Sequence, residues 1–571
     1  MLILALRLFS VQVLRYNHYL SRSDAIRIKP EVIEAPRGFI YDRNGQVMAE
    51  NMMSYSITVD PLERDKLDRS VTRLAALVPS LPRLLNVTED KMIDRIIELS
   101  RRSNNPEKII RDADFRLLSI IEEYNHDLPG LDGTFDQLRS YPFGPFAAHV
   151  IGYMSELTKE EYERLREKGY GYGHSIGRHG IENYYEDVLK GENGTKFVEM
   201  NYLSRKMEMK GEVEPIPALP GDNLTLTLDM RLQIAAEEAF GDTVVGALVA
   251  LNPNNGEVLV MASSPSFDPN EFTHVMTPGR LATLLNNPDN PLFNRAIQAT
   301  YPPGSTFKML TAISGLKNGL TEQSKFQPCR GSYYFGRTYA CWKEGGHGSL
   351  NMVEAIIQSC NVYFYQLGRR LTLEKWQYNA DILGMGKKTG IDLYDEKPGL
   401  LPTMEFYEKN DISYSPGMML NLAIGQGENL VTILQLVHYI GIIATSGINA
   451  TPHMVMSERE PPERIMEISA ESFDVVKRGM LGVIQDPLGT AKTARIPGHL
   501  IAGKTGTAQN PHGSDHKLFV AFAPYDNPSI AVACVAENTG DYDISLAVLI
   551  VRKLLMEYFT YYPDDTVAFN D

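Results

Sequence analysis

The sequence predicts an α+β fold, in which an antiparallel five-stranded sheet covered by helices follows an extended β-rich domain with a helical insertion. From residue 222 onward, two strand-like runs precede a long helical stretch, and three strand-like runs and a last helix follow it. This order suggests one sheet covered by helices. Residues 206–220 are polar and rich in proline, which indicates a linker. We therefore expect one domain over residues 21–210 and a second over residues 222–565.

Composition places the chain among globular proteins. It has 571 residues, of which 43% are apolar and 22% charged, enough for two or three domains with a substantial core. The net charge of −15 and the lack of a basic stripe argue against nucleic-acid binding. Four cysteines are too few for a disulfide scaffold in a chain of this length.

The first residues have the character of a membrane anchor. Residues 1–14 are mostly apolar, with Arg7 and Gln12 as interruptions. The run is shorter than the roughly 20 residues that a membrane-spanning helix needs, and it lacks the small-residue cleavage site of a signal peptide. We expect residues 1–20 to be the outer end of a membrane helix that begins outside this sequence. An amphipathic surface helix is the alternative.

The amino-terminal domain is expected to begin with a hairpin. Apolar residues alternate over residues 35–45, and the Asn-Gly pair that ends this run is a strong turn signal before a strand at 47–59. Apolar residues then recur at helical spacing, so we expect a helical insertion at about 62–140. Three charged residues near the turn are expected to form salt bridges that hold the fold: Arg37, Asp42 and Arg43.

The second domain is expected to open with a strand at 224–228 and a helix at 229–239. Cys534 lies in an apolar run and is most simply a buried strand residue. The closing helix is expected at 544–559. The remaining strand-like runs are at 244–251, 257–262, 500–508, 517–523 and 530–536.

Ser305 and Lys308 form the first candidate catalytic pair. A Pro-Gly pair precedes Ser305, and a helix is expected over residues 306–318. Positions three apart share a helix face, so the Lys308 amine would lie beside the Ser305 hydroxyl and could take its proton. Ser314 and Lys317 repeat the spacing, and we interpret that pair as ordinary helix surface.

Two further motifs follow along the chain. Ser359-Cys360-Asn361 precedes an apolar run, and Lys504-Thr505-Gly506-Thr507 lies inside the first of the three late strands. Each motif has a weaker copy. Ser349-Leu350-Asn351 follows a glycine-rich stretch, and Ser349 is expected to cap the next helix. Lys388-Thr389-Gly390 lies in a turn-like stretch, so context favours the first copies.

Ser-x-x-Lys, Ser-x-Asn and Lys-Thr-Gly in this order are the signature of penicillin-binding proteins and serine β-lactamases. The chain is identified as a member of the class B penicillin-binding proteins, closest to penicillin-binding protein 2, the elongation-type member. The resemblance implies the penicillin-binding serine transpeptidase fold, preceded by a pedestal domain. Residues 36–45, 149–153, 180–182 and 189–191 resemble pedestal motifs, and residues 263–270 and 341–348 are similar to penicillin-binding protein 2.

The resemblance also implies the reaction. Ser305 attacks the carbonyl between the two terminal D-alanines of a peptidoglycan stem peptide, and Lys308 takes its proton. D-Alanine leaves, and an amine of a neighbouring stem peptide attacks the acyl-enzyme. By the same resemblance, Ser359 relays a proton to the leaving group, and Asn361 holds the substrate amide.

The third motif is implied to bind the end of the donor peptide. Lys504 supplies positive charge near the terminal carboxylate, Thr505 and Thr507 donate hydroxyl hydrogen bonds to it, and Gly506 lies between them. The backbone N–H groups of Ser305 and Thr507 are the family's oxyanion-binding pair. A β-lactam mimics the D-alanyl-D-alanine end and acylates the same serine.

The resemblance further implies where the protein works. It points to cell-wall elongation, with the catalytic domain on the periplasmic or extracytoplasmic side of the bacterial cytoplasmic membrane and one membrane helix as anchor. A RodA-type SEDS glycan polymerase and the elongation machinery are the implied partners. No organic cofactor and no nucleic acid are expected.

Three cysteines and a histidine gather in one short region of the sequence. Three thiolates with one imidazole are a donor set of structural zinc sites, and relatives of the penicillin-binding protein 2 type are similar here. We therefore expect one structural Zn²⁺. A Cys329–Cys341 disulfide is the alternative, because the compartment outside the membrane is oxidising. The expected ligands are Cys329, Cys341, His347 and Cys360.

Other functions share such a serine site. A β-lactamase would need a water-activating glutamate after the second motif, where Glu396 and Glu405 lie, but the large first domain argues against it. A D,D-carboxypeptidase shares the site, so a minor carboxypeptidase activity is compatible with it. A septal transpeptidase is the closest rival, and the cysteine–histidine cluster disfavours it. A β-lactam sensor or an inactive scaffold for a glycan polymerase is the alternative from another class.

Overall fold

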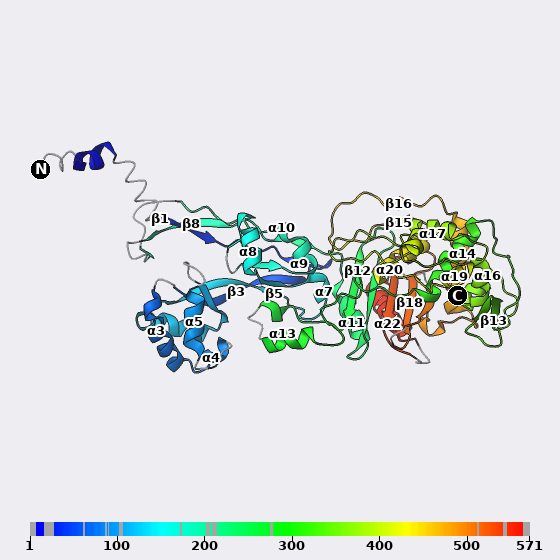
Figure 1. The fold of residues 1–571 in the computed structure, drawn as a ribbon, viewed down its shortest axis with the longest axis horizontal. Coiled ribbons are helices and arrows are strands. Elements are labelled where there is room, and N and C mark those ends of the chain that lie inside the picture. Colours follow the sequence, from blue (N-terminus) through cyan, green and yellow to red (C-terminus); the bar gives the residue numbers. More distant parts are fainter. Residues whose placement is uncertain are drawn as a thin grey trace.

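The molecule is elongated, with the amino-terminal domain at one end and the large sheet with its helices at the other (Figure 1). The structure is a computed structural model. It describes residues 7–15, 28–60, 63–85, 88, 91–101, 107–168, 170–171, 174–200, 206–207, 214–273, 278–510, 513–540 and 545–563.

The five-stranded sheet of the second domain is antiparallel throughout, which confirms the predicted fold class. Its strands lie in the order β12-β11-β19-β18-β17, so the two early and three late strands form one sheet with β17 at an edge. The strands are β11 (Gly246–Leu251), β12 (Val258–Ser264), β17 (Ala502–Ala508), β18 (His516–Ala523) and β19 (Ile530–Ala536).

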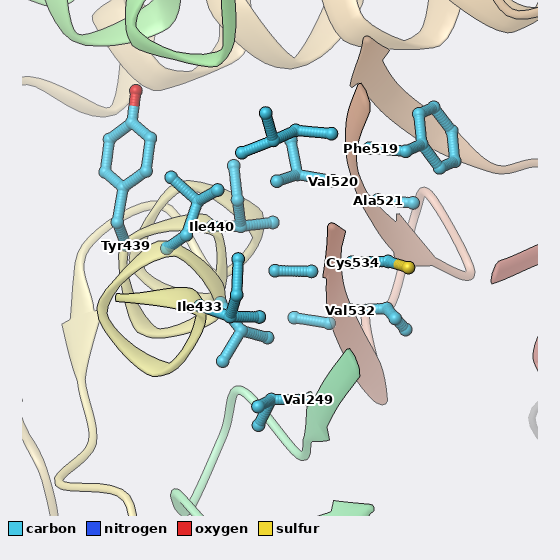
Figure 2. Close-up of a cluster of buried hydrophobic side chains, with 14 of the residues drawn as sticks. Val249, Ile433, Tyr439, Ile440, Phe519, Val520, Ala521, Val532 and Cys534 are labelled. Atoms are coloured by element: carbon cyan, nitrogen blue, oxygen red, sulfur yellow. The ribbon is translucent and has the colours of Figure 1, made fainter. Parts of the chain in front are cut away.

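Helices enclose this sheet. α20 (Ile433–Ala444) packs against β19 and β11, and α22 (Leu546–Tyr561) packs against β18, β19 and α11 (Met230–Phe240). Figure 2 shows Ile433 and Ile440 of α20 facing the strands. Every residue of β19 is buried, including Cys534 as predicted, because both faces of this central strand are covered. Each large aliphatic side chain buried here stabilises the fold by about 1.5–3 kcal/mol.

The long stretch between β12 and β17 is mainly helical, as predicted. It carries the three-residue-per-turn helix η6 (Gly304–Phe307), the helices around it and two small two-stranded sheets. The other elements are α12 (Asn270–Thr273), α13 (Pro278–Leu285), α14 (Lys308–Lys317), β13 (Ser332–Phe335), β14 (Arg337–Ala340), α15 (Met352–Ile357), α16 (Asn361–Gly368), α17 (Leu373–Ile382), α18 (Met404–Lys409), α19 (Pro416–Leu422), β15 (Ile448–Asn449), β16 (Glu463–Arg464), α21 (Ala470–Gln485) and η7 (Lys492–Ala494).

The amino-terminal domain is built on the predicted hairpin. β2 (Ile40–Tyr41) and β3 (Val47–Val59) are antiparallel and are joined by a turn in which Gly45 has φ +79°. A separate three-stranded sheet has the order β1-β8-β9. The remaining elements of this domain are β1 (Ile28–Ile33), β6 (Met154–Glu156), α7 (Ala148–Ile151), α8 (Lys159–Leu165), η5 (Arg166–Lys168), β7 (Ser175–Gly177), α9 (Gly180–Tyr184), α10 (Glu186–Leu189), β8 (Gly194–Met200) and β9 (Lys206–Met207).

The predicted helical insertion contains two strands besides its helices. Helices do occur, but β4 and β5 also lie in this segment, and both pair with β3. The long strand β3 extends beyond its hairpin and needs partners for its backbone groups, which these strands supply. The elements are α3 (Arg64–Leu77), α4 (Leu81–Leu84), α5 (Met92–Ser100), β4 (Glu107–Ala113), α6 (Phe115–Glu123), η4 (Asn125–Asp127) and β5 (Leu131–Ser140).

The strand predicted at 224–228 is shorter and has a different partner. β10 (Leu224–Thr225) pairs in parallel with β2 of the amino-terminal domain and takes no part in the large sheet. The main hydrophobic core likewise includes Ile40 and Met48 of the first domain beside residues of the second. The two domains therefore share backbone pairing and apolar packing.

Charged residues near the first hairpin form ion pairs within the first domain and with the second domain. Arg37 pairs with Glu182 at 2.6 Å and with Glu186 at 2.8 Å, and Arg43 pairs with Glu257 of the second domain at 3.3 Å. Both were predicted as structural ion pairs. Asp42 was predicted to do the same, but it instead accepts backbone N–H bonds, including one from Met230 that opens α11.

The segment predicted as an anchor is described only in part. Residues 7–9 are helical, and η1 (Ser10–Leu14) continues them as one wider helical turn. Residues 1–6 and 16–20 lie outside the described residues. Within the described part of the chain, no helix combines the length and apolar character needed to cross a membrane.

Candidate active site

A glycine-built turn places Ser305 at the start of a buried helix. Ser305 lies within η6, one turn ahead of Lys308, so the helix predicted from residue 306 begins with a tighter turn. Gly304 has φ +55°, a left-handed value that favours glycine. A Cβ on Gly304 would lie 2.4 Å from the Thr507 carbonyl oxygen, so only glycine lets η6 approach β17 this closely.

Lys308 is fully buried and reaches the second motif. Its Nζ donates to the Ser359 carbonyl at 2.8 Å, to Ser359 Oγ at 3.1 Å and to Asn361 Oδ1 at 2.6 Å. Burial lowers the pKa of Lys308 from 10.5 to about 8, because the low-dielectric surroundings disfavour the charged amine. A substantial fraction of neutral amine near pH 8 is what a general base requires.

Lys504 approaches the same serine from the sheet. It lies on β17, is fully buried, and donates from Nζ to Ser359 Oγ at 2.9 Å and to the Thr505 carbonyl at 3.0 Å. Burial and the nearby charge of Lys308 hold the pKa of Lys504 well below its usual value. Ser359 Oγ therefore lies between two amines, which suits a hydroxyl that passes a proton along.

Ser359 itself has an unusual backbone. Its φ is +52°, in the left-handed region that costs an L-residue other than glycine about 1–2 kcal/mol. It lies between α15 and α16, and Asn361 is the first residue of α16. The turn thus directs Ser359 and Asn361 toward the same amine of Lys308.

The third motif lies on β17, beside η6. Thr505 Oγ1 lies 3.1 Å from Thr490 Oγ1, and Thr507 is exposed. A Cβ on Gly506 would lie 3.0 Å from the Thr306 side chain, so glycine allows η6 and β17 to pack closely. The structure brings all three predicted motifs together, while their roles in binding stay predictions.

The cysteine–histidine cluster lies directly behind the second motif. One donor atom from each of Cys329, Cys341, His347 and Cys360 lies within 4.8 Å of the others. His347 Nδ1 is 3.6 Å from Cys329 Sγ and 3.5 Å from Cys341 Sγ. All four cysteines of the chain are free thiols. Because Cys360 separates Ser359 from Asn361, the cluster and the catalytic turn share a segment.

The weaker copies of the three motifs lie in other parts of the fold than the copies described above. Ser314 is buried inside α14, so the prediction of a surface position is wrong for it. Ser349 was predicted to cap the next helix, but Asn351 caps α15 by accepting from Glu354 N–H at 2.9 Å. Lys388 and Thr389 lie outside helices and strands, in the predicted turn-like stretch.

The two glutamates considered for a β-lactamase make local contacts. Glu396 accepts from the Thr389 N–H at 2.7 Å, and Glu405 pairs with Lys409 at 2.7 Å within α18. Their carboxylates therefore already have structural partners.

The sequence reasoning missed a loop that contacts both the first and third motifs. The Gly425 carbonyl accepts from the Gly304 N–H at 2.9 Å, and Gln426 Nε2 donates to the Thr507 carbonyl at 3.0 Å. The signal in the sequence is a single glutamine between two glycines, Gly425 and Gly427.

Comparisons with known proteins agree with this architecture. Residues 246–556 match the penicillin binding protein transpeptidase domain, and residues 32–226 match the penicillin-binding protein dimerisation domain. The chain is 32% identical to peptidoglycan D,D-transpeptidase MrdA of Acinetobacter baumannii, over 94% of this chain and 83% of the relative.

Solved structures give the same picture. One is penicillin-binding protein 2 of Helicobacter pylori in a complex with MreC, with a TM-score of 0.83, 27% identity and coverage of 94% of this chain and 99% of that chain. Another, described as structural coordination of polymerization and crosslinking by a peptidoglycan synthase complex, has a TM-score of 0.74, 30% identity and coverage of 98% and 96%. The chain therefore belongs to the penicillin-binding protein transpeptidase family, among the class B members of the penicillin-binding protein 2 type.

Proposed function

We propose that this protein is a serine-type peptidoglycan D,D-transpeptidase that cross-links stem peptides during cell-wall elongation. The observation that carries the proposal is the position of Ser359 Oγ between the amines of Lys308 and Lys504, with Ser305 one helical turn ahead of Lys308. The family relationship agrees with it, since the MrdA relatives are peptidoglycan D,D-transpeptidases.

In the acylation step, Ser305 Oγ attacks the carbonyl carbon of the penultimate D-alanine as neutral Lys308 removes its proton. Lys308 has the lowered pKa and the burial that this role needs. The tetrahedral intermediate collapses by breaking the peptide C–N bond. Its nitrogen receives a proton through Ser359, D-alanine leaves, and an ester to Ser305 remains.

In the second step, an amine of another stem peptide attacks this ester. The amine loses a proton to the Lys308–Ser359 pair, the ester C–O bond breaks, and Ser305 regains its hydrogen. Asn361 holds the substrate amide, and Lys504 with Thr505, Gly506 and Thr507 binds the carboxylate end of the donor. Preorganised backbone N–H groups stabilise the negative charge that develops on the carbonyl oxygen.

Covalent labelling tests this proposal. Fluorescent penicillin should label the purified protein, and peptide mass spectrometry should place the adduct on Ser305. Ser305→Ala should abolish labelling, whereas Thr306→Ser, one residue along the same turn, should still label. Labelling of Ser305→Ala at the rate of the parent protein would contradict the assignment.

The comparisons suggest partners and location. We propose that the amino-terminal domain, residues 21–210, binds elongation proteins, because penicillin-binding protein 2 of Helicobacter pylori forms a complex with MreC. A RodA-type glycan polymerase is proposed as a further partner, because another similar structure belongs to a peptidoglycan synthase complex that coordinates polymerization and crosslinking. The catalytic domain would then face the outside of the cytoplasmic membrane, with residues 1–20 toward the membrane.

We also propose one structural Zn²⁺ at the cysteine–histidine cluster. In a tetrahedral site with Zn–S of 2.3 Å and Zn–N near 2.05 Å, nitrogen and sulfur ligands lie about 3.6 Å apart. The two distances from His347 Nδ1 to sulfur, 3.6 and 3.5 Å, fit this value. The donor set thus suits zinc, and Cys329, Cys341, His347 and Cys360 would hold it. Bound zinc would stabilise the turn around Ser359 and take no part in the chemistry.

A further inference from the structure

The loop of Gly425 and Gln426 lies directly on the turn that carries Ser305. Gly425 has φ +72°, and a Cβ there would lie 2.2 Å from the Gly304 carbonyl oxygen. Its own carbonyl accepts from the Gly304 N–H at 2.9 Å. The loop is therefore packed backbone against backbone on the residue before Ser305.

The side chain of Gln426 contacts the other half of the site. Its Nε2 donates to the Thr507 carbonyl at 3.0 Å, near the end of β17. Two adjacent residues thus hydrogen-bond to both segments that carry the expected oxyanion-binding N–H groups. The two segments lie far apart in the sequence and meet here without a shared strand or helix.

The geometry of β17 shows why this bond matters. In an antiparallel ladder, a residue directs its N–H and its C=O to the same side. β17 is an edge strand, and the carbonyl of Thr507 accepts from Gln426, a residue outside the sheet and so outside the ladder with β18. The N–H of Thr507 therefore also faces the free edge. Its nitrogen lies 3.2 Å from the point where a Cβ of Gly304 would lie.

We propose that Gln426 is a positioning residue, which holds the Thr507 peptide so that its N–H and that of Ser305 converge on one oxyanion. This inference rests on the proposed transpeptidase function. The bond from Gln426 holds the Thr507 carbonyl in its orientation near the end of the edge strand. Loss of the bond leaves the carbonyl without its side-chain donor and lets the N–H turn away from the reacting carbonyl.

The test is the acylation kinetics of Gln426→Met, a neutral side chain of similar length that cannot donate. Removal of a whole oxyanion donor slows catalysis about 10²–10³-fold, so a displaced donor should lower the acylation rate constant about tenfold. The initial non-covalent affinity for penicillin should stay within about twofold, because the oxyanion forms only in the transition state. A peptide boronic acid, whose tetrahedral adduct on Ser305 places an oxygen in the same position, should lose affinity by the same factor.

Gln377→Met is the matched control. Gln377 Nε2 also donates to a backbone carbonyl, that of Pro402 at 2.5 Å, but on α17. It should lower the melting temperature to a similar extent and leave the acylation rate constant unchanged. An unchanged rate constant in Gln426→Met, or an equal loss in Gln377→Met, would overturn the inference. Persistent labelling of Ser305→Ala would instead refute the proposed function, so the two failures are distinct.

Discussion

Lys308 Nζ lies 2.6 Å from Asn361 Oδ1 and 3.1 Å from Ser359 Oγ, so one buried amine connects the helix of the first motif to the turn of the second. The contact joins residues more than 50 positions apart. Lys308 has no ion-pair partner among the described residues. Its burial is accounted for by three oxygen acceptors, which satisfy the three N–H groups of the amine.

The acylation rate should rise with pH up to about 8. Lys308 accepts a proton only when neutral, and burial lowers its pKa to about 8. Below that pH, the rate constant for penicillin acylation should fall about tenfold per pH unit, and above it the rate should level off. Stopped-flow measurements from about pH 6 to about pH 10, roughly two units on each side of the pKa, would test this. A profile that is flat across pH 8 would exclude Lys308 as the base.

Two variants of Ser359 distinguish the effect of backbone strain on stability from the effect of the hydroxyl on catalysis. Ser359→Gly and Ser359→Ala both remove the hydroxyl and should slow acylation by about 10²–10⁴-fold, the usual contribution of positioned proton transfer. Because φ is +52°, the glycine variant should be more stable than the alanine variant by about 1 kcal/mol. Chemical denaturation of both variants measures the difference. Equal stabilities would argue that the left-handed backbone is not strained.

Sequence patterns predicted the sheet because long apolar runs stay recognisable when both faces are buried, as in β19. They predicted the three motifs because each pairs specific residue types at fixed spacing. They placed the cap of α15 at Ser349, because serine and asparagine are both good caps and lie two residues apart. Gln426 could not be predicted, since its contact depends on how a loop packs against a strand 81 residues away.

Metal removal should act locally. Cys341→Ala, or dialysis against a strong chelator, should slow Ser305 acylation and lower the melting temperature of the second domain while the first domain stays folded. The reason is that Cys360 lies between Ser359 and Asn361, so loss of a ligand loosens the catalytic turn. Elemental analysis should find about one zinc per chain in the parent protein, as four ligands make one closed site.

Cys534→Ala is the control for the cysteine variants. This thiol is fully buried in β19, apart from the cluster, so its loss should reduce stability without changing the zinc content. A parent protein without zinc that contains a mapped Cys329–Cys341 disulfide would decide against the metal.

Glu237 should make the contact between the domains sensitive to pH. This half-buried carboxylate on α11 accepts from the Ala147 N–H of the first domain at 2.8 Å and from Gln233 Nε2 at 2.7 Å. Burial raises the pKa of Glu237 to about 7, above its usual 4.5.

The folded state then binds the proton more tightly than the unfolded state does, so the stability contributed by this group is complete below pH 4.5 and is lost as the pH rises through 7. Glu237→Gln keeps the acceptor oxygen and removes the buried charge, so at pH 8 it should raise the free energy of unfolding by about 1–3 kcal/mol. At pH 4.5 the variant should gain little. Thermal unfolding at both pH values measures this, with Glu238→Gln, an exposed neighbour on the same helix, as the matched control. If Glu237→Gln is destabilising at pH 8, the carboxylate is charged and well paired, and the explanation is wrong.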